Sequence, residues 1–125
     1  MRVAAFSTAV ALCAGLAGCE VMPHDRDVRA LTGGDPFRGR ELIAGYGCDS
    51  CHTIPGVETA DANVGPPLTK VALRLYLAGR VENTPANMML WIQHPRSVDE
   101  RTAMPEMGVT EQDSRDITAY LYTLR

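Results

Sequence analysis

The sequence has little of what would mark a nucleic-acid-binding protein or a membrane-spanning one. Its formal net charge is −3, with 12 basic and 15 acidic side chains, whereas a nucleic-acid-binding surface needs a basic patch. An uncharged run at residues 3–18 is shorter than the roughly 20 apolar residues of a transmembrane helix, and it is rich in Ala and Gly. The 125 residues suffice for one compact domain, and they contain no internal repeat.

The amino-terminal segment has the form of an export signal. A positive start, Met1-Arg2, precedes the apolar run, which ends in Leu16-Ala17-Gly18-Cys19. This ending resembles the lipobox of bacterial lipoproteins, in which the peptide is cut before the Cys and the Cys is acylated. We therefore expect residues 1–18 to be removed as a signal peptide and Cys19 to carry lipid. Ordinary cleavage near Ala17 is the alternative, and it would leave Cys19 as a free thiol.

The segment that follows is predicted to be flexible. Residues 19–34 carry charges, a Pro and a Gly pair but no apolar periodicity, so they are expected to form a lipid-anchored tether. The folded domain then comprises residues 35–125. Removing residues 1–18 takes away Cys13 and one charge, that of Arg2, and lowers the net charge to −4.

Four helical signals and no convincing strand predict an all-α domain of short helices and long loops. Capping residues or apolar periodicity place the helices from Asp35-Pro36 to Gly47, from about Thr69 to Gly79, from Thr84-Pro85 to Pro95, and from Thr110 to the carboxyl end. A long loop covers residues 53–67. Such short helices form a thin core, which a large flat apolar cofactor would complete.

The two remaining cysteines form a close pair followed by a histidine. Cys48-Asp49-Ser50-Cys51-His52 is a C-x-x-C-H motif, the attachment signature for c-type haem. Two thiols three residues apart can reach the two vinyl groups on one porphyrin edge, and the next residue, His52, then lies under the ring. The sequence therefore predicts one covalent haem with His52 on the iron.

Three other readings of the motif lack their usual context. A thioredoxin-like dithiol would need a βαβ setting. A zinc site would need two further ligands, and only His24 and His94 remain. A plain disulfide would leave His52 without a role.

The second axial ligand is predicted to be Met104. The following Pro105 disfavours helical geometry at Met104, so this thioether should lie on an extended loop, free to point at a ring. A Met and His pair raises the reduction potential of a haem. Met107 remains the alternative, whereas Met88 falls on an apolar helical face and is expected to be core.

Four sequence features together resemble a class I cytochrome c. They are the C-x-x-C-H motif, G-P-P-L at 65–68, T-A-M-P at 102–105 and a final helix ending A-Y-L-Y-T-L at 119–124. The resemblance covers residues 35–125 and implies a cytochrome c fold with haem c. It also implies that the Pro66 carbonyl bonds the outer nitrogen of His52 and that Leu68 presses on the haem.

The resemblance implies further roles. The first and last helices should cross at a Gly, for which Gly39 and Tyr120 are the candidate contact. The middle segment resembles a bacterial branch found near respiratory-chain proteins, and four of its residues could hold the haem propionates: Arg74, Tyr76, Asn87 and Trp91. Trp91 could equally be a core residue.

With both axial positions filled, the haem could pass one electron but could not readily activate a substrate. The expected function is therefore a one-electron carrier rather than an enzyme, at the periplasmic face of a bacterial membrane. Its donor would be a quinol-oxidising complex or a dehydrogenase, and its acceptor a terminal oxidase. A fixed electron-transfer subunit, a haem enzyme or sensor with a displaceable ligand, and a soluble periplasmic form remain alternatives.

Overall fold

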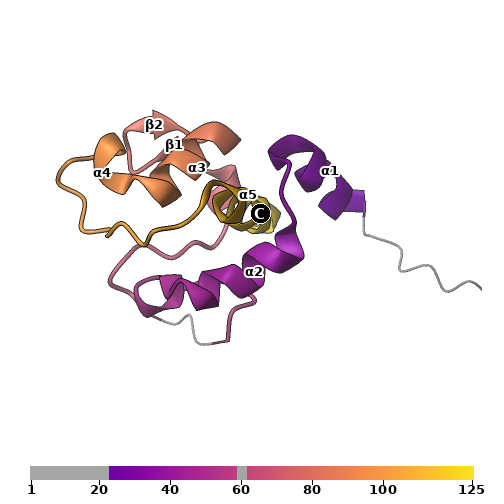
Figure 1. The fold of residues 1–125 in the computed structure, drawn as a ribbon, viewed down its shortest axis with the longest axis horizontal. Coiled ribbons are helices and arrows are strands. Elements are labelled where there is room, and N and C mark those ends of the chain that lie inside the picture. Colours follow the sequence, from indigo (N-terminus) through magenta and orange to yellow (C-terminus); the bar gives the residue numbers. More distant parts are fainter. Residues whose placement is uncertain (1–22, 59–61) are drawn as a thin grey trace, which may run out of the picture.

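A computed structural model describes residues 23–58 and 62–125 of the chain. Within them the fold is mostly helical, as predicted (Figure 1). The α-helices are α1 (Pro23–Thr32), α2 (Pro36–Gly45), α3 (Pro85–Gln93), α4 (Pro95–Val98) and α5 (Glu111–Thr123). Short elements are the 3-10 turns η1 (Cys48–Ser50) and η2 (Val71–Leu73) and a hairpin of β1 (Tyr76–Leu77) and β2 (Val81–Glu82). None of the described helices is long and apolar enough to span a bilayer.

The three capped helices begin where the sequence predicts. The Asp35 side chain accepts the Phe37 N–H at the start of α2. Thr84 caps α3 and Thr110 caps α5 in the same way. These caps satisfy backbone N–H groups that have no partner inside the helix, so local sequence alone sets these boundaries.

Helices α2 and α5 cross at close range and form the centre of the fold. A Cβ atom on Gly39 would lie 1.9 Å from the Asp116 carbonyl oxygen, so only glycine fits at this crossing. The expected Gly contact is therefore present, but its partner is the α5 backbone at Asp116 and Ile117. Tyr120 lies elsewhere, and its hydroxyl donates a hydrogen bond to the Pro55 carbonyl at 2.5 Å.

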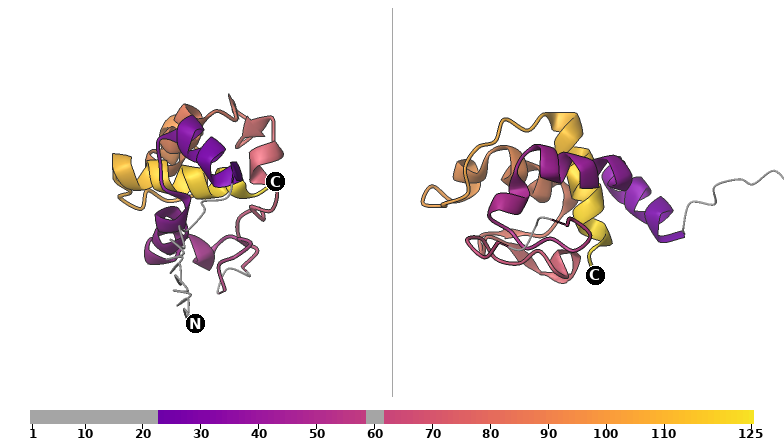
Figure 2. Two further views of the ribbon diagram at one scale, coloured as in Figure 1. Left: turned by 90° about the vertical axis from the view of Figure 1, so that its right-hand side faces the viewer. Right: turned by 90° about the horizontal axis from the view of Figure 1, so that it is seen from below.

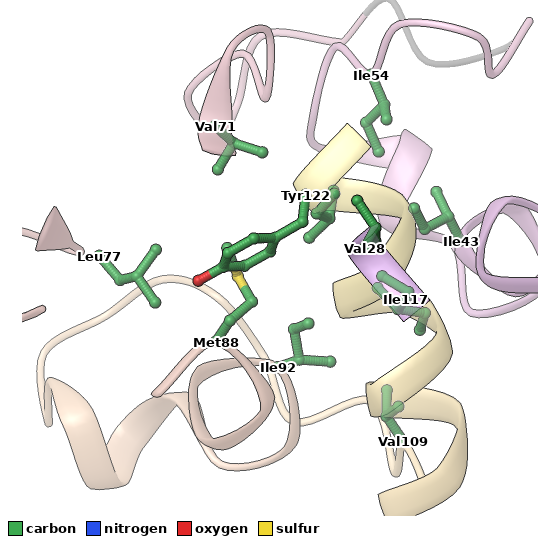
Figure 3. Close-up of a cluster of buried hydrophobic side chains, with 12 residues drawn as sticks. Val28, Ile43, Ile54, Val71, Leu77, Met88, Ile92, Val109, Ile117 and Tyr122 are labelled. Carbon is green, nitrogen blue, oxygen red and sulfur yellow. The ribbon is translucent and has the colours of Figure 1, made fainter. Parts of the chain in front are cut away.

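One apolar core lies between α5 and the elements around it (Figure 3). Val28 of α1, Ile43 of α2, and Met88 and Ile92 of α3 contribute to it, and Ile117 of α5 is 2 % exposed at its centre. The buried position of Met88 confirms its expected role as core.

The helix predicted from about Thr69 to Gly79 is wrong. The structure instead has the turn η2 and the β1–β2 hairpin, in which Tyr76 pairs with Glu82 and Leu77 with Val81. The strands are joined by the three residues 78–80, and the Arg80 N–H donates to the Leu77 carbonyl at 2.9 Å. Ala78 and Gly79, the central residues of this turn, both have positive φ. The spacing of the apolar residues in this segment therefore does not mark the buried face of a helix, since Leu75 is 80 % exposed.

The flexible tether predicted for residues 19–34 is also wrong where the structure describes the chain. Residues 23–32 form α1, which packs on α5 and α2. Val28 is 1 % exposed and Thr32 is 4 % exposed. The predicted signal peptide and Cys19 lie outside the described residues.

Candidate functional site

The C-x-x-C-H motif forms one tight turn after α2. Gly47, with φ of 73°, ends the helix and redirects the chain into η1. The Cys48 carbonyl then accepts the backbone N–H groups of Cys51 at 3.3 Å and of His52 at 3.1 Å. Because residues three and four apart share a face of a helical turn, this backbone is expected to place both thiols and the imidazole on one side.

A second segment, residues 65–68, is bonded to this turn. The Gly65 N–H donates to the Cys51 carbonyl at 2.7 Å, and the Leu68 N–H donates to the Thr53 carbonyl at 2.8 Å. The His52 Nδ1 lies 2.7 Å from the Pro66 carbonyl oxygen. The hydrogen bond that the G-P-P-L resemblance implied is therefore present.

This bond determines what the imidazole can do. A carbonyl oxygen can only accept, so Nδ1 must carry the proton that it shares with Pro66. Nε2 then keeps its lone pair and can bind a metal, and the fixed Nδ1–H bond holds the ring in one orientation. Among the described residues no group of three or more His, Cys, Asp and Glu side chains could hold a metal ion.

Gly65 is a site residue that the sequence analysis named only as part of the turn. A Cβ at this position would lie 2.4 Å from His52 Cε1 and 2.7 Å from Nδ1. The imidazole therefore packs face to backbone on Gly65, and any side chain there would displace the ring. The signal was available in G-P-P-L, but the steric reason appears only in three dimensions.

The environment of Cys48 is not that of a redox-active thiol. Cys48 and Cys51 are both free and half-buried. Burial raises the pKa of the Cys48 thiol, with a smaller contribution from the nearby Asp49 charge. A catalytic or disulfide-exchanging Cys needs a lowered pKa, so this environment argues against the thioredoxin-like reading.

Met104 lies in an extended loop between α4 and α5, as its position before Pro105 predicts. Its backbone N–H donates to the Thr102 hydroxyl at 3.1 Å, and it is half-buried. Met107 in the same loop is 43 % exposed. The loop geometry therefore agrees with a Met104 that faces the interior more than Met107 does.

The segment carrying Gly65 and Pro66 exposes large apolar side chains. Val64, Leu73, Leu75 and Tyr76 are 77 %, 60 %, 80 % and 57 % exposed. Leu68 is half-buried and packs on the core. Exposed apolar surface of this kind marks a ligand or partner site, and a flat apolar ring bonded to the neighbouring motif would fit it.

Comparison with known protein families identifies the family of this chain and the ligand that the family implies for this site. The model of the family described as Cytochrome c matches residues 37–125. The chain belongs to the cytochrome c family. Haem c is therefore the cofactor that the family implies, and the cytochrome fold described above has Cys48 and Cys51 at the C-x-x-C-H positions.

A curated relative of this cytochrome is the cytochrome c oxidase subunit 2 of Alkalihalophilus pseudofirmus (strain ATCC BAA-2126 / JCM 17055 / OF4). The two are 33 % identical over 89 residues, which is 70 % of this chain and 25 % of the relative. The chain thus spans only a quarter of that protein's length. No solved structure matches the cytochrome.

The four propionate candidates do not form one cluster of free donors in this cytochrome. The Arg74 guanidinium donates to the Pro67 carbonyl, and the Asn87 amide donates to the Glu82 carbonyl at 2.9 Å. Tyr76 is exposed. Trp91 is half-buried against the core, in keeping with the core alternative.

Asn83 is a residue that the sequence analysis missed. Its amide donates to the carbonyls of Val71 and Arg74, both at 2.9 Å, and its side-chain oxygen accepts the Tyr122 hydroxyl at 3.0 Å. These three hydrogen bonds connect the segment after Leu68 to α5. No local pattern marks such a residue, because its partners are 9 to 39 positions away.

Proposed function

We propose that the protein is an exported monohaem cytochrome c that carries single electrons. Cys48 and Cys51 bind the haem covalently, and His52 and Met104 are the axial ligands. Cys19 is the lipid anchor, and the protein works at the periplasmic face of a bacterial membrane. It is an electron-transfer protein rather than an enzyme.

The observation that carries this proposal is the fixed imidazole of His52. Its Nδ1 is bonded to the Pro66 carbonyl, its face packs on Gly65, and its Nε2 stays available. The haem supplies reversible one-electron chemistry. The chain's own contribution is to keep His52 in one tautomer, to present Met104 from the opposite loop and to cover the ring with Leu68. Arg74, Tyr76 and Trp91 remain the proposed neighbours of the haem propionates.

Axial ligation can be tested by carbon monoxide binding to the reduced protein. We expect the unmodified protein to bind carbon monoxide slowly or not at all, because no position on the iron is open. Met104→Ala should bind it rapidly and lose the weak Met–iron charge-transfer band. Met107→Ala is the matched control and should behave like the unmodified protein.

Two outcomes would contradict the proposal. Loss of the charge-transfer band in Met107→Ala would assign the ligand to Met107. Rapid binding by the unmodified protein would favour a haem enzyme or sensor instead.

The proposed donors are a quinol-oxidising complex or a dehydrogenase, and the proposed acceptor is a terminal oxidase. The similarity to a quarter of an oxidase subunit 2 supports a terminal oxidase as the acceptor. It also favours a second candidate, a fixed subunit of an oxidase complex. Purification in mild detergent distinguishes the two, because a fixed subunit would co-purify with the oxidase in constant ratio and a shuttle would not.

A further inference from the structure

Helix α1 lies outside the residues that match the cytochrome c family, yet it is firmly attached to the domain. The family match begins at residue 37, whereas α1 is Pro23–Thr32. Val28 inserts into the core, and the Thr32 hydroxyl donates to the Val28 carbonyl at 2.9 Å and accepts the Gly34 N–H at 3.1 Å. The helix is thus a part of the folded body.

The connection between α1 and α2 is equally constrained. Arg29 forms an ion pair with Asp35 at 2.7 Å, and the Asp35 N–H donates to the Asp116 carboxylate of α5 at 2.8 Å. A Cβ on Gly34 would lie 2.2 Å from the Arg115 carbonyl oxygen, so the connection runs directly against the α5 backbone. These contacts hold the connection between α1 and α2 against α5.

The two ends of the molecule have different roles. Figure 1 and the right-hand view of Figure 2 place the amino end of α1 at one end of the molecule and the segment between α4 and α5 at the other. Helix α2 runs between these ends, and Cys48 follows its far end. The segment that carries Met104 therefore lies opposite the point where the chain leads back to Cys19.

The length of chain before α1 is short. Cys19 and Pro23 are separated by Glu20, Val21 and Met22, which span at most about 14 Å when extended. A flexible segment from Cys19 to Asp35 would instead reach about 55 Å. A domain of this size is about 30 Å across. A connection of about 14 Å therefore keeps the amino end of α1 near the bilayer, whereas the opposite end can stand about 30 Å further from it.

We propose that α1 is a rigid spacer that holds the amino end of the domain at the bilayer and turns the haem side away from it. Redox partners then bind on the membrane-distal side and must present an extramembrane surface. This inference rests on the lipid anchor of the proposed function. It departs from the expected flexible tether, which would let the domain face the membrane in any orientation.

The height of each end above a bilayer can be measured on the full haem-loaded chain in vesicles of phosphatidylethanolamine and phosphatidylglycerol. Nitroxide spin labels would be attached at Arg26→Cys in α1 and at Arg96→Cys in α4. Nickel-chelating lipids enhance the spin relaxation of a nearby label, so the relaxation of each label would report its distance from the bilayer. The measurement uses the protein with its haem reduced. Both positions are exposed. We expect the relaxation at position 26 to exceed that at position 96 at least fivefold.

Two changes should abolish this difference. Eight Gly and Ser residues inserted between Met22 and Pro23 lengthen the connection without touching the fold, and the ratio should fall below two. Val28→Asp should undock α1 and act similarly, while Ala30→Asp, on the exposed face of the same helix, should leave the ratio unchanged.

The outcomes separate this inference from the proposal on which it rests. Equal relaxation at the two positions, or a ratio that the inserted residues do not change, overturns the spacer. Mass spectrometry of the amino-terminal peptide tests the lipid anchor separately from the relaxation experiment. A peptide without acyl groups on Cys19 overturns the anchor and with it the spacer, whereas an acylated peptide with equal relaxation overturns the spacer alone.

Discussion

The helical half of the molecule, α1, α2 and α5, differs sharply from the loop half, residues 62–83 and 99–109. In the helical half side chains are buried by other protein elements, and Ile43, Ile117 and Val28 are at most 2 % exposed. In the loop half large apolar side chains stay exposed, as Leu75 and Val64 show. The contrast is one of degree, because Leu31 and Phe37 of the helical half are also exposed and Val71 of the loop half is buried. The loop half nevertheless has more of its large apolar side chains without a protein partner.

This difference suggests separate roles for packing within the protein and for the haem that the family implies. Burial of apolar surface stabilises the helical half whether or not a cofactor is bound. The loop half contains Pro66 and Met104, the groups proposed to orient or ligate the haem, and its exposed apolar surface would be covered by a bound ring. The comparison predicts that damage to each half has different consequences.

The largest effect is expected from removing the covalent attachment. Cys48→Ala combined with Cys51→Ala should abolish covalent haem completely, so that acid–acetone extracts all pigment. Amide hydrogen exchange should then rise far more in residues 62–76 than in α2 and α5, because only the loop half loses its apolar partner. Ser50→Ala, inside the same motif, should retain covalent haem. A similar loss of protection from hydrogen exchange in both halves would contradict the distinction between the helical half and the loop half.

The helix crossing should be the next most sensitive point. Gly39→Ala places a methyl group against the Asp116 backbone, and we expect a loss of about 3 kcal/mol in the free energy of unfolding. Gly45→Ala is the matched control in the same helix, because a Cβ there meets nothing within 4 Å; it should be neutral or stabilise by about 0.5 kcal/mol. Denaturant titration of both variants measures the difference. Similar values for the two would contradict a close crossing.

A change on the loop side should alter ligation more than global stability. Gly65→Ala forces the His52 ring away from its position, so the bond to Pro66 should break. We expect about 1–2 kcal/mol of destabilisation together with a changed visible spectrum. Gly39→Ala should show the reverse pattern, with a large loss of stability and an unchanged spectrum in the folded protein. If both variants changed the spectrum alike, the two halves would not be separable.

Much of the helical half could be predicted from local sequence, because its signals are local. Asp35 caps α2 and Thr110 caps α5 through groups at most three residues away, and Thr84 caps α3, outside this half, in the same way. Helix α1 could not be predicted in this way. Its ten residues contain few apolar side chains, and of these only Val28 belongs to the buried apolar core.

The loop half shows the opposite limitation. The spacing of Leu68, Val71, Ala72 and Leu75 fits a helix, but the backbone at Lys70 and at Ala78 has positive φ, which a helix cannot accommodate. The C-x-x-C-H motif and Pro66 could be found from sequence because each belongs to a short pattern. The contacts of Gly65 with His52 and of Asn83 with Tyr122 join distant segments, so only the fold reveals them.

The smallest predicted effect concerns the pH dependence of the helical half. Asp113 of α5 accepts hydrogen bonds from the Tyr46 hydroxyl at 2.7 Å and from Arg38. The Tyr46 hydrogen bond, with help from Thr110 and Arg38, lowers the pKa of Asp113 below its ordinary value of 3.8. The ionised carboxylate therefore stabilises the fold above that value, and this contribution is lost as the pH falls through the lowered pKa.

Asp113→Asn keeps the shape of the side chain but removes its charge. We expect a lower Tm than that of the unmodified protein at pH 7, and the difference should shrink as the pH falls below the ordinary carboxyl range. Glu111→Gln is the control on the same helix. Its ion pair with Arg115 is exposed, and exposed pairs contribute little to stability. Thermal unfolding of the three proteins from pH 7 to pH 3 tests the sign, and a difference that grew toward acid pH would show that the Asp113 carboxylate does not stabilise the α2–α5 contact.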